Sequence, residues 1–183
     1  MAYLLHYSGA VEFLPDMLNG RYAHGIVVWK RAVHVFGSCL GDEGRLCESL
    51  DITAWTALPK MHHMRAYFTP VVWQEAVYLC GGHINTIEVY DGVSMELLPL
   101  RLPERSATMA CAKGETLLMI TERHSTLLSG KKNTFSDASL TVKKHAQLFY
   151  SNSSSPVWWG SHFYLCSDSK ILKYSVEDCR RLD

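Results

Sequence analysis

Short apolar segments separated by polar pairs recur along the chain. GIVVW (25–29) is followed by two polar residues and then by a second apolar stretch, AVHVF (32–36). The same order returns at VVW (71–73) and AVYLC (76–80), and the alternating stretch that comes next ends at Asp91-Gly92. β-Branched residues favour strands, and Asp-Gly favours a tight turn because glycine accepts a positive φ. The pattern therefore predicts short β-strands joined as antiparallel hairpins.

The pattern repeats at a nearly constant spacing. RYAHGIVVWKRAVHVFG (21–37) aligns with RAYFTPVVWQEAVYLCG (65–81) at an offset of 44 residues, which pairs Arg21 with Arg65. A weaker copy begins at Arg105, and a further one lies near the C-terminus. Repeats of about 40–45 residues made of short strands are typical of β-propellers. We therefore predict an all-β fold built of four-stranded antiparallel units.

Tryptophan marks the same position in three of the four copies. Trp29 matches Trp73 at an offset of 44, and Trp159 matches Trp73 at an offset of 86, whereas Lys113 takes this place in the third copy. Large aromatic residues at equivalent repeat positions indicate a shared packing role. We expect each tryptophan to be buried where neighbouring units meet.

The whole chain, 1–183, is predicted to form a single domain. Its units lie at approximately 17–60, 61–102, 103–148 and 149–183. We expect residues 1–16 to supply strands to a terminal unit by pairing 3–14 with 170–174, which would close a ring of four units; the alternative is that the chain forms part of a larger propeller. After a strand-like start, the rest of 113–145 is polar and rich in lysine, which predicts a long loop and an irregular hairpin. No segment predicts a helix.

The second unit carries a set of residues with a family likeness: Met61, Arg65, Tyr78, Gly81-Gly82, Glu88, Tyr90-Asp91 and Leu98-Pro99. In this order they resemble the kelch repeat, whose family folds as a β-propeller with four-stranded blades. The first unit departs from the family pattern at Ser38, where a second glycine is expected, and the third and fourth units lack both glycines. The resemblance implies a diverged or truncated kelch-like β-propeller with about four blades.

Two adjacent glycines, Gly81-Gly82, are also compatible with a phosphate-binding loop. The chain has no G-x-x-x-x-G-K-[ST] motif, and no predicted helix follows whose N-terminus could hold an anion. We therefore predict that both glycines, like Gly37, end the second strand of a unit where backbones crowd together. Arg21 and Arg65 stand at the start of units, and we expect them to donate hydrogen bonds that link units rather than to contact a ligand.

Composition and charge narrow the function classes. Of 183 residues, 48% are hydrophobic and 20% are charged, and 18 Lys and Arg balance 18 Asp and Glu. This neutrality gives no electrostatic reason to expect a nucleic acid or an anionic membrane as partner. No apolar run is long enough to cross a bilayer as a helix, and the N-terminus lacks a signal-peptide pattern. The six cysteines form no C-x-x-C pair, and Cys80 and Cys166 lie in apolar runs, so we expect structural free thiols and a cytoplasmic protein.

No catalytic motif stands out. His62-His63 would point to opposite faces of a strand, so a solvated loop is favoured over a metal site. The chain has no H-E-x-x-H motif, no nucleophile elbow and no pair of carboxylates at an informative spacing. We therefore expect no catalytic residues, no metal and no cofactor, and a protein that is not an enzyme.

Most kelch domains are binding modules, so the resemblance implies a scaffold or protein-interaction role. The alternative is a small-ligand or sugar-active propeller enzyme that uses the axial pocket. In a four-stranded unit, the loop between the second and third strands lies on the same side as the connections between units, and loops on a rigid scaffold commonly carry binding. The candidate partner-binding residues on that side are Arg45, Lys60, His62, His63, His83, Asn85, Arg101, Arg123 and His124, together with Lys131 and Lys132.

This set leans basic, although Asp42, Glu43 and Glu104 lie among its members. A basic surface favours a partner protein or peptide that is acidic. Polar loops that are merely solvated are the alternative. Strands left unpaired at the ends of the chain also favour self-association.

Overall fold

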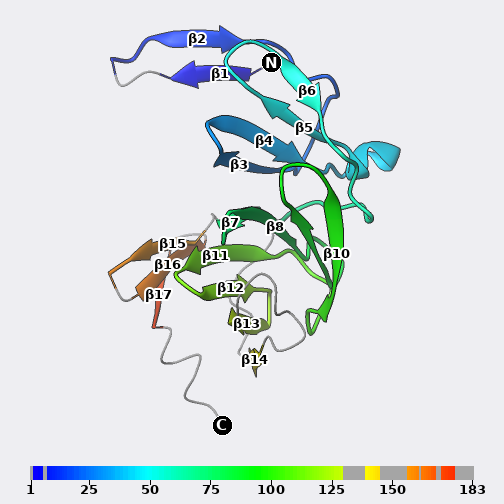
Figure 1. Cartoon of the computed structure of the whole chain (residues 1–183). Helices are drawn as coiled ribbons and strands as arrows, with labels where there is room; N and C mark the ends of the chain where they lie inside the picture. The colour runs from blue at the N-terminus through cyan, green and yellow to red at the C-terminus, as the bar shows by residue number, and fades with distance from the viewer. Residues whose placement is uncertain are drawn as a thin grey trace.

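The computed structural model describes residues 2–5, 8–129, 139–144, 156–160, 162–167 and 170–175. Within these residues the chain is all-β: its strands form five sheets, and neighbouring strands in each sheet run antiparallel (Figure 1). A short 3₁₀ helix, η1 (Gly41–Arg45), interrupts the strands in the first unit. None of the described residues belongs to a helix that is long and apolar enough to pass through a membrane.

Three of the sheets contain four strands each, in chain order. The first consists of β3 (Gly25–Trp29), β4 (Ala32–Phe36), β5 (Cys47–Leu50) and β6 (Trp55–Ala57). The second consists of β7 (Val71–Trp73), β8 (Ala76–Cys80), β9 (Thr86–Tyr90) and β10 (Met95–Arg101). The third consists of β11 (Met109–Lys113), β12 (Thr116–Ile120), β13 (His124–Ser129) and β14 (Ser139–Lys144). The fourth sheet has the three described strands β15 (Val157–Trp159), β16 (His162–Ser167) and β17 (Lys170–Ser175), and β1 (Ala2–Leu5) pairs with β2 (Val11–Leu14) in an N-terminal hairpin.

Tight polar turns join the first two strands of the sheets, as predicted. Lys30-Arg31 and Gln74-Glu75 all have positive φ, between 48° and 65°, which suits the right-handed twist of an antiparallel hairpin. The last residue of each first strand then pairs with the first residue of the second strand. These pairs are Trp29 with Ala32, Trp73 with Ala76, Lys113 with Thr116 and Trp159 with His162. The register confirms that the four positions are structurally equivalent.

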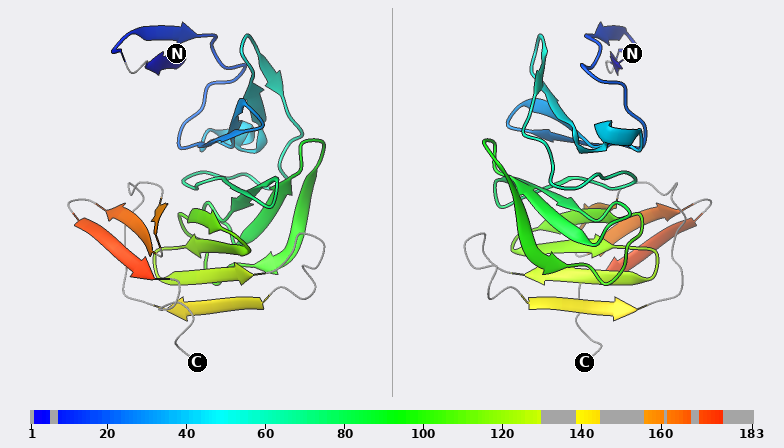
Figure 2. Two further views of the ribbon diagram at one scale, coloured as in Figure 1. Left: turned by 60° about the vertical axis from the view of Figure 1, so that its left-hand side comes forward. Right: turned by 90° about the vertical axis from the view of Figure 1, so that its right-hand side faces the viewer.

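The sheets stack on one another through their first strands. β3 contacts β7, β7 contacts β11, and β11 contacts β15 (Figures 1 and 2). Apolar side chains fill the space between successive sheets: Trp29 and Phe36 of the first sheet belong to one cluster with Val77 and Leu79 of the second. The core therefore lies between sheets, and each sheet depends on its neighbours to bury its faces.

Two of the three equivalent tryptophans are buried between sheets, as expected. The Trp29 ring lies against Tyr90 of the second sheet, with ring centroids 5.7 Å apart. Trp73 packs on the third sheet, and its Nε1 donates a 2.8 Å hydrogen bond to the carbonyl of Gly114. The expectation is wrong for Trp159, whose residue is 75% exposed. No described strand follows β17, and the face of the fourth sheet that carries Trp159 packs on none of the described sheets.

The glycines that end the second strands occupy crowded turns, as predicted. Gly37, Gly81 and Gly82 have φ values of +75°, +64° and +82°. A Cβ atom on Gly37 would overlap the carbonyl of Arg65, and one on Gly81 would overlap the side chain of Thr108. Both contacts are with segments that lead into the next sheet, so these turns need glycine for backbone angle and for space.

The N-terminal segment does not complete the last unit, which corrects one expectation. β1 and β2 pair with each other, and β17 pairs with β16 and with no other described strand. β1 and β2 therefore form a hairpin that precedes the first sheet as the third and fourth strands of a unit would. Pairing between distant segments depends on how far the stacked sheets curve, which a local pattern does not specify.

The third unit also forms a regular strand in a segment that we expected, from its polar residues, to be a long loop. Instead of a long loop, a short turn at residues 121–123 leads into β13, where Leu127 and Leu128 are buried. Ser125 and Thr126 are also buried on this strand. Because they are polar, the sequence pattern did not indicate a buried strand here. Residues 130–138 of the expected hairpin lie outside the described residues.

Trp73→Ala tests the packing role of the buried tryptophan, with Trp159→Ala as the matched control. We expect Trp73→Ala to lower the free energy of unfolding by about 3–5 kcal/mol, because it removes a large buried ring and leaves a cavity. Trp159→Ala, at an equivalent but exposed position, should change this free energy by less than about 0.5 kcal/mol. Urea denaturation at low protein concentration measures both values. Equal losses for the two variants would contradict the assignment.

Candidate binding surface at the loop edge

One edge of the stacked sheets carries the loops between second and third strands and the segments that lead into the next sheet; we call it the loop edge. Main-chain hydrogen bonds hold these segments together across sheets. Ser38 N donates to Arg65 O (3.0 Å), and His83 N donates to Ser106 O (2.9 Å). The prediction that both kinds of connection share one side is confirmed by these bonds.

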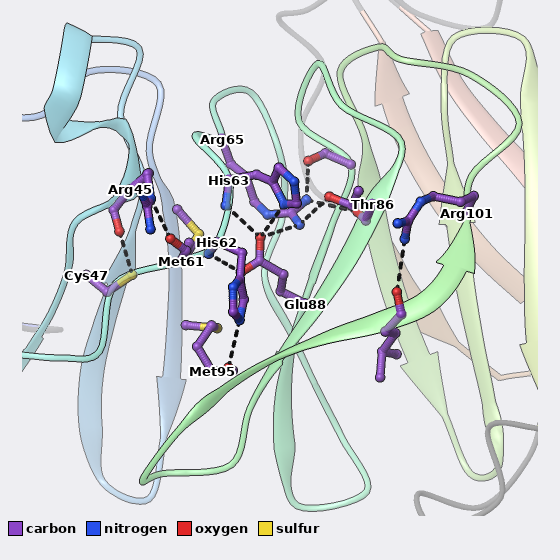
Figure 3. A network of polar contacts seen from close by, with 12 residues as sticks. Arg45, Cys47, Met61, His62, His63, Arg65, Thr86, Glu88, Met95 and Arg101 are labelled. Atoms are coloured by element: carbon purple, nitrogen blue, oxygen red, sulfur yellow. Dashed lines mark hydrogen bonds and ion pairs between the residues drawn. The ribbon is translucent and has the colours of Figure 1, made fainter.

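A buried arginine braces the loop edge in the second sheet. Arg65 Nη1 donates to the carbonyls of Gly81 (2.6 Å) and Thr86 (2.9 Å), and Nη2 donates to Thr86 Oγ1 and to Glu88 Oε1, both at 2.8 Å (Figure 3). The side chains of Arg65 and Glu88 are both fully buried. Because a buried charge is tolerated only when it is paired and hydrogen-bonded, this pair ties the segment before β7 to β8 and β9.

The Glu88 carboxylate also holds two of the predicted histidines. It accepts hydrogen bonds from the main-chain N–H groups of His62 (2.6 Å) and His63 (3.2 Å). The Nδ1 atom of His63 lies 3.4 Å from Glu88 Oε1, whereas the His62 ring extends the other way and places Nε2 3.1 Å from the carbonyl of Met95 (Figure 3). The histidine pair is thus a loop whose backbone is fixed on a buried carboxylate.

The first sheet repeats this arrangement. Arg21 donates to the carbonyls of Gly37 (3.1 Å) and Leu46 (2.6 Å) and to Glu48 Oε1 (2.5 Å), and Asn19 Nδ2 donates to the same carboxylate oxygen (2.7 Å). Burial raises the pKa of Glu48, but the hydrogen bonds from Asn19 and Arg21 and the Arg21 charge outweigh it and hold the pKa below its ordinary value. Both arginines are therefore structural donors, as expected, but their guanidinium groups brace their own sheet. The link to the preceding unit comes from the Arg65 main chain.

The third sheet lacks the buried ion pair. Thr121 N donates to His124 O as Gly81 N donates to Thr86 O, so Thr126 stands where Glu88 stands in the second sheet. Arg105, the counterpart of Arg65, is exposed. Threonine replaces the glutamate and the arginine is exposed, which is physically consistent, since an arginine left unpaired in the interior would be strongly destabilising.

Glu104 organises the loop of the third sheet instead. Its Oε1 accepts hydrogen bonds from Thr121 Oγ1 and from Arg123 N (2.9 Å), and it lies 3.3 Å from His124 Nδ1. Burial raises the pKa of Glu104, but the hydrogen bonds from Thr121 and Arg123 and the contact with His124 hold it below its ordinary value. Two of the predicted basic residues therefore surround a carboxylate, which offsets part of the positive charge expected there.

A pocket of about 330 Å³ opens at the loop edge where the first and second units meet. Its walls include Ser38, Cys39, Met64, Ala66, His83 and Ile84. The side chain of Tyr67 stands edge-on to His83, with ring centroids 5.3 Å apart, and Tyr22 stands edge-on to Tyr67 at 6.3 Å. The pocket combines apolar side chains with an exposed thiol and an exposed imidazole, a lining that suits an apolar or mixed side chain of a partner.

The predicted site residues are spread along the loop edge, and they do not converge on one point. Arg45, Lys60, His62, His83, Arg101 and Arg123 are exposed, whereas His63, Asn85 and His124 are half-buried. Only His83 among them lines the pocket. The three arginines Arg45, Arg101 and Arg123 lie at this edge of the first, second and third sheets, respectively. Lys131 and Lys132 lie outside the described residues.

Sequence reasoning missed Cys39 as a site residue. Cys47, Cys80 and Cys111 are buried, as expected, and burial raises the pKa of the Cys47 and Cys80 thiols to about 12. Cys39 is exposed and lines the pocket. The signal was available, because Ser38-Cys39 aligns with Gly82-His83 at the offset of 44 and both pairs directly follow a strand-ending glycine. Among the described residues, no three His, Cys, Asp or Glu side chains lie close enough together to hold a metal ion.

Glu48→Gln tests the buried ion pair through the pH dependence of stability, with the exposed Glu75→Gln as control. Because the pKa of Glu48 is depressed in the folded state, its contribution is complete above the ordinary value of 4.5 and is lost as the pH falls through the folded-state value. We expect Glu48→Gln to lower the free energy of unfolding by about 3–5 kcal/mol at neutral pH, and this difference from wild type to shrink in acid. Urea denaturation across an acid-to-neutral pH series measures it. A difference that stays constant with pH would argue against the pair.

Comparison with known proteins assigns no family to the chain. A scan against protein-family models finds no match, and a search of curated proteins finds none either. The kelch resemblance therefore depends on the residues of the chain itself, chiefly the repeated tryptophan, the strand-ending glycines and the arginine–glutamate pairs of the first two units.

Proposed function

We propose that this chain is a kelch-type β-propeller module that binds a partner protein or an acidic peptide through its loop edge. Its four-stranded antiparallel sheets follow one another in chain order, and their first strands lie in sequence against one another. This is the arrangement that blades adopt around a propeller axis. The proposal treats each sheet as one blade and each first strand as the blade's innermost strand.

The observation that carries the proposal is the pocket between the first and second units. Loops from one unit and connecting segments from the next both line it, so it exists only because the sheets stack. Main-chain hydrogen bonds and the buried Arg65–Glu88 pair hold its surroundings in place. A concave site on a scaffold held in this way binds at a lower cost in conformational entropy than a mobile loop does.

Exposed arginines around this edge favour an acidic partner. Arg45, Arg101 and Arg123 are all exposed, and the described hydrogen bonds of Arg45 and Arg101 side chains go to main-chain carbonyls. Their positive charge is therefore not neutralised by a carboxylate in those contacts. Guanidinium groups pair well with carboxylates, because two parallel N–H donors match the two oxygens.

We favour this function over an enzyme that uses an axial pocket. The buried carboxylates Glu48 and Glu88 are each bound to an arginine and to at least one main-chain N–H group. Carboxylates held this way are suited to bracing the fold, since a general acid or base needs a free proton position near a substrate.

Charge reversal at three arginines tests the electrostatic part of the proposal. A displayed library of random peptides, selected on the wild-type protein at about 0.15 M salt, should yield acidic sequences. We expect Arg45→Glu/Arg101→Glu/Arg123→Glu to weaken binding of these peptides by about tenfold or more, with an unchanged melting temperature. The control Lys30→Glu/Arg31→Glu reverses charge in a turn at the opposite edge and should keep binding. Equal loss in both variants, or none in either, would contradict the loop edge as the site.

Thiol labelling tests the pocket itself. N-Ethylmaleimide should react at the exposed Cys39 before the buried Cys47, Cys80 and Cys111, because access governs thiol reactivity. The added group would fill part of the pocket, so we expect labelled protein to lose the selected peptides. Cys39→Ser treated with the same reagent should still bind them. Full binding by the labelled wild-type protein would show that the partner does not use this pocket.

A further inference from the structure

The fourth sheet repeats four apolar residues of the second sheet at the same structural positions. Val157 pairs with Tyr164 as Val71 pairs with Tyr78, and Trp159 ends its strand as Trp73 does. Ile171 pairs with Cys166 as Ile87 pairs with Cys80. The Trp159 and Tyr164 rings lie 5.8 Å apart, close to the 5.0 Å between Trp73 and Tyr78. We call the set Val157, Trp159, Tyr164 and Ile171 the tryptophan face of the fourth sheet.

The two equivalent faces differ in burial. In the second sheet, Trp73, Tyr78 and Ile87 are at most 3% exposed, because the face packs on the third sheet. In the fourth sheet, Val157, Trp159 and Ile171 are 63%, 75% and 71% exposed. Lys173 pairs with Tyr164 on the same face, where the second sheet has Val89. The three apolar side chains beside it are nevertheless open to solvent, and soluble proteins rarely leave such a set without a partner.

The structure also shows what such a face packs on. In the third sheet, Ala112 and Leu117 lie against the cluster that contains Trp73, and Trp73 Nε1 donates to the carbonyl of Gly114 in the first turn. One sheet further on, Lys113 Nζ donates to the carbonyl of Gly160, the corresponding turn residue. In both cases the side chain of the residue that ends a sheet's first strand donates a hydrogen bond to the next sheet. The acceptor is the carbonyl of the first residue in the turn after that sheet's first strand.

The first sheet carries residues equivalent to those of the third sheet that receive Trp73, and these residues are exposed. Val28 corresponds to Ala112, since each stands one residue before the end of the first strand, and Ile26 lies two residues earlier on the same face. Val28 is 68% exposed and Ile26 is 58% exposed. Lys30 directly follows Trp29, so its carbonyl occupies the place of the Gly114 carbonyl. We call Ile26, Val28 and the Lys30 carbonyl the receiving face.

We propose that a second copy of this chain docks on the first, with the tryptophan face of one copy packed against the receiving face of the other. Trp159 Nε1 then donates to the carbonyl of Lys30 in the second copy, and Val157 and Trp159 cover its Val28. This contact would have the same geometry as the contact between the second and third sheets within one chain. Within one copy the first and last sheets lie apart, so each face is available to another molecule (Figure 2).

The two faces are different surfaces, so this association is heterologous. Each copy keeps a free tryptophan face at one end and a free receiving face at the other, and assembly proceeds head to tail into chains or a closed ring. This distinguishes the proposal from a symmetric dimer, in which one patch meets itself. It also makes the inference independent of the loop edge, which lies elsewhere on the molecule.

Single lysine substitutions on the two faces provide the test. Sedimentation velocity of the wild-type protein should show species larger than a monomer that grow with concentration. Trp159→Lys and Val28→Lys should each weaken association by more than about tenfold and sediment as monomers, because each blocks one half of the contact. A mixture of the two variants should form a one-to-one dimer and nothing larger, because one good face remains on each. Val93→Lys, at a turn residue that is 82% exposed, is the control and should associate as wild type does.

Three outcomes would overturn the proposal. A wild-type protein that stays monomeric at all concentrations would show that no second copy covers these faces. Association that survives in Val28→Lys but not in Trp159→Lys would indicate a symmetric contact between two tryptophan faces. Failure of the mixed variants to form a dimer would show that the two faces do not fit each other. Both substituted side chains are exposed, so at a concentration low enough to keep wild type monomeric, the melting temperatures of the variants should match wild type and confirm that they fold.

Discussion

The contact between the end of one sheet's first strand and the face of the next sheet is the interaction on which the rest of this structure depends. Short antiparallel strands form sheets with two faces, and no such sheet is stable with both faces in water. Here Trp29 and Trp73 close the gap to the following sheet, and Lys113 takes the same place with a longer polar side chain. Core, turn geometry and loop positions all follow from this repeated stacking.

Buried charge supplies the second organising element. A surface ion pair would add little to stability, whereas Arg21–Glu48 and Arg65–Glu88 are buried and also bind main-chain carbonyls and N–H groups of the loop edge. These pairs fix the segments where the chain leaves one sheet and enters the next. Arg65 also lines the pocket, so one of these pairs helps to form its wall.

Local features of the fold were predictable, and long-range ones were not. The strand pairs around Lys30-Arg31 and Gln74-Glu75 followed from β-branched runs and polar turns, and the offset of 44 residues identified the equivalent tryptophans. A tryptophan at this position is buried only when another sheet packs on it. The prediction of burial was therefore correct for Trp29 and Trp73 and wrong for Trp159. The separate N-terminal hairpin depends on curvature accumulated over several sheets, which no short segment encodes.

The sequence predicted the side of the sheets on which the candidate site lies, but it did not predict which residues come together there. Repeat alignment placed the loops on one side, but it could not show that Cys39 and His83 share a pocket, because that depends on how two sheets pack. Nor could spacing reveal that Glu104 lies beside Arg123 and His124, since these residues meet only after the third sheet folds. A count of basic residues along the sequence therefore missed the carboxylate that lies among them at this edge.

Lys113 takes the place of tryptophan in the third sheet, and this difference affects which part of the molecule unfolds locally most easily. An indole fills space on both sides of a contact, whereas a lysine stem is flexible and its charged head prefers water. The third sheet also lacks the buried ion pair of the first two. In stacked repeats, stability is close to a sum of terms for each unit and each neighbour contact. Fluctuations should thus be largest toward the fourth sheet, so that amide exchange and proteolysis begin there while the first two sheets and their pocket remain folded.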